Sequence, residues 1–380
     1  MKLIHLADLH IGKRVNEISM IEDQRYILKQ VLECVAEEQP DGILIAGDIY
    51  DRMVPSVEAV QLLDTFLTEL SNQKVPVYLI SGNHDSAERV SFGAKLLTKS
   101  QIYMATQYQG KMEKVTMQDA YGRVNLYLLP FLKPAQVRAV WKEEAEGIST
   151  YQDAIDFVMA KEEINPEERN VLVAHQFVAG AQTCDSEERS IGGLDQIAAT
   201  SYQVFDYVAL GHLHGPQQVS RKTIRYAGTL LKYSFSEIHH KKSITIVELR
   251  EKGQVEVRQR PVRPLHDMRQ LRGNYEELVK RENYENTDTE DYLRIILSDE
   301  EDIYDAVGKL RVIYPNLMRL EYDNTRTRKR QTIGETEPVE KKMPIDFMEE
   351  LYQIQNNKAM SLEQRNYMKK MMETIWEEKA

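Results

Sequence analysis

The chain has 380 residues, of which 42% are hydrophobic and 29% are charged, so it can form one large core and a smaller domain. Sixty acidic and 49 basic residues give a net charge of −11, which excludes a polycation that binds nucleic acid through bulk charge. Two cysteines are too few for a disulfide framework, and no apolar run reaches the length of a membrane span or a signal core. We therefore expect a cytoplasmic protein with no membrane segment.

The first ninety residues predict a βαβαβ unit with a parallel sheet. Strands are expected at residues 2–7, 42–46 and 77–80, and apolar stripes within 27–35 and 57–70 predict the helices between them. Later strands are predicted at residues 125–129, 171–174, 206–210, 223–226 and 243–249, with a helix at 151–161. This first domain is expected to end near residue 264.

The remaining sequence predicts three further segments. Residues 265–322 restart the pattern, with helices near 275–281 and 303–312 and strands at 292–297 and 317–322, which indicates a small α/β domain. Residues 323–342 contain almost no large apolar side chain and read as a charged linker. Residues 343–380 predict two amphipathic helices, the second of which begins with a capping box formed by Ser361 and Gln364.

Potential metal ligands follow five of the predicted strands. They are Asp8, His10, Asp48, Asn83, His84, His175, His212 and His214. Because open α/β sheets bind ligands at the carboxyl ends of their strands, we expect these side chains to converge. Mixed carboxylate, amide and imidazole donors suit a pair of manganese-like or iron-like ions, and Asp48, on the middle strand and next to Gly47, is the expected bridge.

Each of these pieces also has a structural interpretation. An Asp-x-His after a strand can be a turn or a helix cap, and Gly-Asn-His-Asp can be an ordinary turn. The conjunction of all the pieces at strand ends favours a two-metal site over those separate interpretations.

The ordered motifs resemble the signature of calcineurin-like metallophosphoesterases. They are Asp8-x-His10, Gly47-Asp48, Gly82-Asn83-His84-Asp85, His175 and Gly211-His212-Leu213-His214. More narrowly, HLADLHIG, GDIYDR, SGNHDS, ALGHLH and YAGTLLKYSFSE resemble the nuclease subunits of bacterial SbcCD complexes, with departures at Thr229 and Leu230. The resemblance implies an α/β sandwich of two mixed β-sheets flanked by helices, a small capping domain over DNA and a C-terminal helical hairpin.

The resemblance also implies roles for individual residues. One ion would be surrounded by Asp8, His10, Asp48 and His214, and the other by Asp48, Asn83, His175 and His212. Two Mn²⁺ ions are expected, with Mg²⁺ or Fe²⁺ as substitutes. His84 is left outside the ligand set, and we expect it to protonate the leaving group or stabilise the transition state, oriented by Asp85.

Basic side chains provide candidate DNA contacts. Lys13, Arg14 and Arg52 lie near the metal-binding motifs and could touch substrate phosphates, although charges near strand ends are common on any surface. Residues 241–281 contain eleven basic and six acidic residues, so they predict a locally basic face, which can equally be an ordinary solvated surface.

The resemblance therefore implies a Mn²⁺-dependent DNA nuclease subunit that acts in DNA repair and recombination. It would be a double-strand exonuclease and a single-strand and hairpin endonuclease. The resemblance implies that residues 343–380 bind an SbcC-type coiled-coil ATPase and that two nuclease subunits pair within a heterotetramer at the nucleoid. The chain has no GxxxxGK[ST] motif, so ATP is expected on the partner. The alternatives are a metallophosphatase of another branch and a scaffold that has lost its metal.

Overall fold

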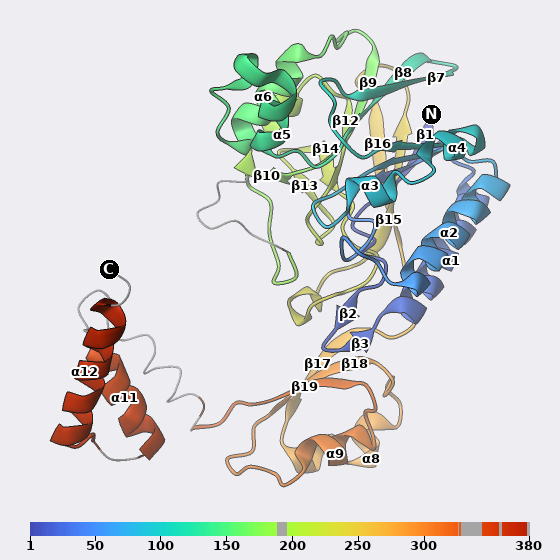
Figure 1. Cartoon of the computed structure of the whole chain (residues 1–380). Coiled ribbons are helices and arrows are strands. Elements are labelled where there is room, and N and C mark those ends of the chain that lie inside the picture. Colours follow the sequence, from blue (N-terminus) through green and yellow to red (C-terminus); the bar gives the residue numbers. More distant parts are fainter. Residues whose placement is uncertain (188–195, 326, 328–343, 357–358, 378–380) are drawn as a thin grey trace. The chain divides into compact units, whose positions relative to one another are not determined.

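Two six-stranded sheets pack face to face in the computed structural model, which describes residues 1–187, 196–325, 327, 344–356 and 359–377 (Figure 1). The first sheet has the order β16 (Val255–Pro261), β15 (Ser243–Leu249), β1 (Lys2–Leu6), β4 (Gly42–Ala46), β5 (Val77–Ile80) and β6 (Ile102–Ala105). The second has the order β13 (Gln217–Val219), β14 (Arg221–Tyr226), β12 (Tyr207–Gly211), β9 (Arg169–His175), β8 (Gly122–Leu129) and β7 (Glu113–Asp119).

Both sheets are mixed, with a parallel centre. Strands β1, β4, β5 and β6 run parallel to one another, and β15 and β16 extend that sheet in antiparallel register. Strands β8, β9, β12 and β14 are parallel, with antiparallel β7 and β13 at the two edges. The carboxyl ends of β1, β4, β5, β9 and β12 therefore supply the loops in which the predicted ligands lie.

Apolar side chains fill three layers of this sandwich. Leu44 and Tyr78 of the first sheet and Val173 and Ala209 of the second belong to one buried cluster between the sheets. Helices α1 (Ile21–Glu38) and α2 (Val57–Asn72) cover the outer face of the first sheet, and α5 (Pro134–Trp141) and α6 (Tyr151–Lys161) cover the second. Each helical face is buried because its apolar residues recur at helical spacing.

The α2 stripe differs from the prediction at its first turns. Val57 and Val60 are 70% and 46% exposed, whereas the buried face begins at Ala59 and continues through Leu63 and Phe66. The two valines lie off the i, i+3, i+4 positions that face the sheet, so they remain on the surface.

Short elements join the main ones. They are the hairpin β2 (Arg14–Val15) and β3 (Ile18–Ser19), the pair β10 (Phe177–Val178) and β11 (Gln196–Ile197), and helices α3 (Ala87–Val90) and α4 (Ala94–Leu97). A separate three-stranded sheet contains β17 (Met268–Gly273), β18 (Tyr292–Leu297) and β19 (Leu317–Tyr322), with helices α7 (Tyr275–Leu278), α8 (Arg281–Tyr284) and α9 (Ala306–Arg311).

The described residues divide into two compact units. One contains Met1–Leu297 and Ile303–Glu321, and the other contains Ser298–Asp302 and the described part of Tyr322–Ala380. The domain boundaries expected after residues 264, 322 and 342 remain predictions, and most of the expected linker lies outside the described residues. Among the described helices, none is long and apolar enough to cross a membrane.

The second unit contains the helices α11 (Pro344–Asn356) and α12 (Leu362–Glu377). The predicted capping box is present, because Ser361 N–H donates to Gln364 Oε1 at 2.9 Å and Gln364 N–H donates to Ser361 Oγ at 3.2 Å. Gln364 Nε2 also donates to Tyr352 Oη across the helix pair at 3.1 Å.

Candidate metal centre

Asp48 lies at the centre of the converging side chains. Its Oδ2 atom is 3.7 Å from His10 Nε2 and 3.4 Å from His175 Nε2, so one carboxylate oxygen faces ring nitrogens from two different strands. Its other oxygen, Oδ1, accepts a hydrogen bond from the His84 backbone N–H at 2.9 Å. This geometry suits the predicted bridging carboxylate.

A second group of donors gathers around Asn83. Its Oδ1 atom lies 3.0 Å from His175 Nε2 and 3.0 Å from His212 Nδ1. His175 Nδ1 lies 2.8 Å from the carbonyl oxygen of Ala46, which can only accept, so Nδ1 carries the proton. The Nε2 atom of His175 thereby faces Asp48 and Asn83, in the arrangement typical of a metal-binding histidine.

A third group contains two imidazoles that face each other. His10 Nε2 and His214 Nε2 are 3.1 Å apart, and both rings are buried. Ligand atoms of His10, Asp48 and His84 lie within 4.8 Å of one another, as do those of Asp8, Asp48 and His175. Both groups include Asp48.

The backbone is strained at four of the predicted ligands. The φ angles are positive: 52° at Asp8, 43° at His10, 51° at Asp48 and 104° at His212. Residues other than glycine rarely adopt this backbone conformation. Hydrogen bonds maintain these conformations, such as that from His212 N–H to Asp8 Oδ1 at 2.7 Å. Strain of about 1–3 kcal/mol per residue is concentrated at functional sites.

Burial and mutual charge set the protonation of these groups. Burial lowers the pKa of His212 to about 3 and lowers that of His10 well below its ordinary value, so both rings are neutral donors. Burial opposes ionisation of Asp48, but the neighbouring histidines, with His175 foremost, together keep the Asp48 pKa well below its ordinary value. Burial lowers and the Asp48 and Asp8 carboxylates raise the pKa of His175, which reaches about 9.

The residues present fit a divalent cation. Asp8 Oδ2 and His10 Nδ1 are buried side-chain atoms for which the described residues provide no hydrogen-bond partner. A buried, unpaired carboxylate oxygen is costly unless a cation satisfies it. The mixture of carboxylate, amide and imidazole donors is the one that manganese and iron accept.

Among the described residues, no hydrogen bond joins Asp85 to the His84 side chain that it was predicted to orient. The two Asp85 oxygens accept hydrogen bonds from the backbone N–H groups of Ile49, Tyr50 and Gly82 at 2.9–3.0 Å. Asp85 therefore fixes the loops after β4 and β5, because it satisfies donors that those turns leave free. The His84 ring instead contacts the carbonyl oxygen of Asp51 through Nδ1, at 3.0 Å. Its other ring nitrogen, Nε2, is not part of this contact.

The three basic side chains predicted to contact DNA differ in how free they are to bind a phosphate. Lys13 Nζ and Arg52 Nε both pair with Asp51, at 2.7 Å and 3.6 Å, but the Arg52 side chain stays highly exposed. Arg14 donates to the Glu17 carbonyl.

Much of the basic stretch at 241–281 is neutralised. Arg258 and Arg260 pair with Glu38 and Glu37 of α1, and Arg269 pairs with Asp291. The excess of basic residues counted within 241–281 therefore overstates the positive charge of the folded surface. That count leaves out the acidic partners that distant segments supply.

Several supporting residues were not predicted. Gln24 donates to the His10 carbonyl at 2.7 Å and accepts from Gly12 N–H at 2.8 Å. These two hydrogen bonds fix the loop after β1 that carries Asp8 and His10. Phe131 stacks on His212 with ring centroids 6.3 Å apart. Gln24 could have been noticed in the sequence, because it is a polar residue at the start of the apolar stripe of α1.

Comparisons with known proteins identify the family of this chain. Residues 1–216 match the calcineurin-like phosphoesterase family, and residues 264–356 match the type 5 capsule protein repressor C-terminal domain. A protein of Staphylococcus epidermidis, named as the SbcD subunit of the nuclease SbcCD, is 34% identical, covering 84% of this chain and 85% of the relative. A protein of the same name from Staphylococcus saprophyticus is 36% identical over 84% of each chain.

The chain belongs to the SbcD family of calcineurin-like phosphoesterases. Membership confirms the predicted sandwich fold and the prediction of a metal-dependent phosphodiesterase. A solved dimetal phosphatase from Danio rerio aligns with a TM-score of 0.41 and 14% identity, covering 69% of this chain and 96% of the other.

Proposed function

We propose that this protein is the Mn²⁺-dependent nuclease subunit of an SbcCD-type complex and hydrolyses phosphodiester bonds at duplex DNA ends and hairpins. The observation that carries the proposal is the convergence of candidate metal ligands from five strand ends, with Asp48 at the centre and the β12 histidines reaching Asn83 and His10. When bound, two divalent cations supply Lewis acidity that activates water and offsets the phosphate charge.

We assign the ligands in two overlapping sets that share Asp48. One ion takes Asp8, His10, Asp48 and His214, and the other takes Asp48, Asn83, His175 and His212. The buried, unpaired Asp8 oxygen and the opposed His10 and His214 nitrogens support the first set, and the contacts of Asn83 with two imidazoles support the second.

His84 is the candidate catalytic acid. The Asp51 carbonyl accepts the Nδ1 proton, so the ring is held with Nε2 directed away from that contact. Its edge packs against His10 with centroids 4.9 Å apart, which places it beside the metal ligands. From there a protonated Nε2 protonates the leaving oxygen of the phosphodiester or stabilises its developing charge.

DNA is favoured over a small phosphate ester by what surrounds the site. Relatives that carry the SbcD name match over 84% of the chain, which extends the likeness beyond the phosphoesterase sandwich. The β17–β18–β19 sheet is an addition that a simple phosphatase does not require. Arg52 is the strongest of the three candidate phosphate contacts because its side chain is 74% exposed.

We propose two protein partners. The hairpin α11–α12 binds an SbcC-type ATPase in the cytoplasm beside the nucleoid. A second copy of this chain pairs through the exposed α2 valines and the neighbouring Met53 and Val54, because these side chains form an apolar surface that water disfavours.

A cleavage assay tests the nuclease proposal. Linear duplex and hairpin DNA are incubated with the full chain and Mn²⁺, Mg²⁺ or EDTA, in parallel with Asp48→Ala and His84→Ala. We expect Mn²⁺-dependent cleavage that EDTA and Asp48→Ala abolish. His84→Ala should slow cleavage by about 10²–10⁴-fold while still binding two ions, because it removes only the acid.

The phosphatase alternative gives a different result. Hydrolysis of p-nitrophenyl phosphate esters without cleavage of either DNA, also in the presence of the ATPase, would replace the nuclease proposal. Metal analysis that finds no bound ion would favour the scaffold instead.

A further inference from the structure

The Nε2 atom of His214 faces His10, and the opposite ring nitrogen, Nδ1, contacts a chain of polar side chains. His214 Nδ1 lies 2.8 Å from Ser186 Oγ, and Ser186 Oγ lies 2.6 Å from Glu237 Oε1. An ionised carboxylate can only accept, so the single hydroxyl proton of Ser186 goes to Glu237. Ser186 Oγ must then accept the Nδ1 proton of His214, which leaves the lone pair on Nε2.

Glu237 is held as an acceptor by its surroundings. It is fully buried, and its Oε2 atom accepts from the Lys242 ammonium while Oε1 also accepts from Tyr233 N–H at 3.2 Å. Lys242 Nζ further donates to the His214 carbonyl at 2.9 Å and to Thr229 Oγ1 at 2.6 Å. All three ammonium protons are therefore used within this network.

The backbone of His214 is fixed by the same network. Its N–H donates to Glu187 Oε1 at 2.7 Å, and its carbonyl accepts from Lys242 and from Thr229 N–H at 3.1 Å. The main chain and the ring orientation of this one ligand are thus set by residues from two other segments of the chain.

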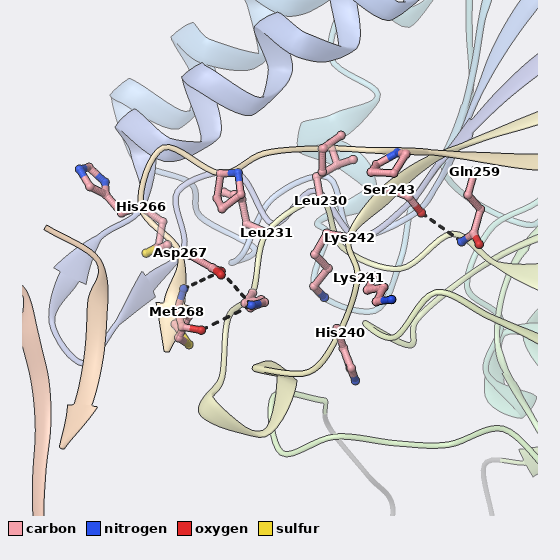
Figure 2. Close-up of a pocket in the computed structure, with 15 residues that line it drawn as sticks. Leu230, Leu231, His240, Lys241, Lys242, Ser243, Gln259, His266, Asp267 and Met268 are labelled. Atoms are coloured by element: carbon pink, nitrogen blue, oxygen red, sulfur yellow. Dashed lines mark hydrogen bonds and ion pairs between the residues drawn. The ribbon is translucent and has the colours of Figure 1, made fainter. Parts of the chain in front are cut away.

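Two other interpretations of this region are weaker. Cys184, His214 and Glu237 offer ligand atoms within 4.8 Å of one another, but the Lys242 ammonium already neutralises Glu237 and would repel a cation there. Lys242 also borders a cavity of about 460 Å³ (Figure 2), yet its three protons point to Glu237, His214 and Thr229 and none remains for a ligand in that cavity.

We propose that Ser186 and Glu237 are positioning residues that hold His214 as the Nδ1–H tautomer and direct its Nε2 lone pair at one of the two ions. Buried Lys242 keeps Glu237 in place as the acceptor. The inference rests on the proposed function, because it assigns the support of a ligand in that metal centre. Such supporting hydrogen bonds typically change metal affinity by about 10–100-fold.

Metal titration tests this role without depending on catalysis. Chelator-treated full chain is titrated with Mn²⁺ by calorimetry, with electron paramagnetic resonance recorded at each step. We expect Ser186→Ala to bind one of its two ions about 10–100-fold more weakly and to give the spectrum of a single, uncoupled Mn²⁺. Ser186→Thr keeps the hydroxyl and should restore both, since Ser186 is only partly buried.

Ser149→Ala is the matched control. It removes an exposed hydroxyl that donates to Asp153 Oδ2 at 3.2 Å at the start of α6, so both ions should bind as in the wild type. The inference is overturned if Ser186→Ala binds both ions normally, loses both equally, or is not restored by Ser186→Thr. A wild-type chain that binds fewer than two ions would instead overturn the proposed function, whatever the variants do.

Discussion

Gly211 is the residue that lets the two sheets approach each other at the metal centre. A Cβ atom at this position would lie 1.7 Å from the Ala46 carbonyl oxygen and 2.7 Å from His175 Nδ1. These two atoms form the hydrogen bond that orients His175. A side chain at residue 211 must therefore separate β12 from β4 and disturb a ligand at the same time.

We expect Gly211→Ala to lower the free energy of unfolding by about 1–3 kcal/mol, because a methyl group is forced into a filled space. It should also weaken Mn²⁺ binding. Chemical unfolding and calorimetric titration measure the two effects. Gly147→Ala is the control, since nothing lies within 4 Å of its Cβ position, and equal behaviour of the two variants would contradict the argument.

The convergence of the proposed ligand residues could be predicted from sequence, whereas the residues that support them could not. His175 is the last residue of β9, and His10 and His214 lie in the loops after β1 and β12. The carboxyl ends of parallel strands meet at one edge of a sheet, so these residues were expected to converge. Ser186 is 28 residues from His214 and 51 from Glu237, and no periodicity relates such positions. The hydrogen bonds of Asp85 could not be predicted for the same reason. Their backbone donors, Ile49 and Tyr50, belong to a loop that comes near Asp85 only in the folded chain.

At the scale of elements, buried strands were predicted well and most edge strands were missed, although edge strand β19 has the predicted bounds. Strands β4, β5 and β18 have the predicted bounds because their residues form continuous or nearly continuous apolar runs between turn signals. Edge strand β7 reads EKVTMQD, with one half-buried face and one exposed face, and β17 reads MRQLRG. Pairing with a neighbour, rather than their own composition, makes these segments strands.

One ion pair fastens the β7 edge to the centre of its sheet. Arg169, at the start of β9, donates through both terminal nitrogens to Asp119 of β7, one contact being 3.0 Å. This hydrogen bonding by Arg169 holds the pKa of Asp119 below its ordinary value of 3.8. The unfolded carboxyl therefore binds a proton more tightly than the folded one, so the pair stabilises the fold above about pH 4 and loses this effect as pH falls further.

Asp119→Asn should lower the free energy of unfolding at pH 7 by about 1–2 kcal/mol, since it removes the charge from a paired hydrogen bond. The difference from the wild type should shrink as the pH falls below 3.8. Urea unfolding across the pH range measures it. Glu256→Gln breaks the exposed pair with Arg250 and should change stability by less than about 0.5 kcal/mol. A difference independent of pH would argue against the charge mechanism.

At the scale of the whole molecule, the metal centre and the terminal hairpin belong to separate compact units. Everything that the proposed hydrolysis uses, from Asp8 to Lys242, lies in the first unit. The proposed ATPase contact lies in the second. The two functions should therefore be separable by mutation.

The hairpin presents exposed apolar side chains at helical spacing. Phe347 and Leu351 on α11 are 42% and 49% exposed and lie four residues apart, as do Tyr367 and Met371 on α12. Side chains with this spacing share one helix face, so each helix offers an apolar strip to a partner. Burial of such anchors typically dominates the affinity of an interface.

Phe347→Glu combined with Leu351→Glu should weaken capture of an SbcC-type coiled-coil ATPase by at least about tenfold, because it charges the centre of that strip. Metal-dependent DNA cleavage by the variant alone should equal that of the wild type, since the site is in the other unit. Val312→Glu is the matched control, being an exposed apolar residue beyond the hairpin. Calorimetry with the purified ATPase measures affinity, and unchanged capture by the double variant would mean that the partner binds elsewhere.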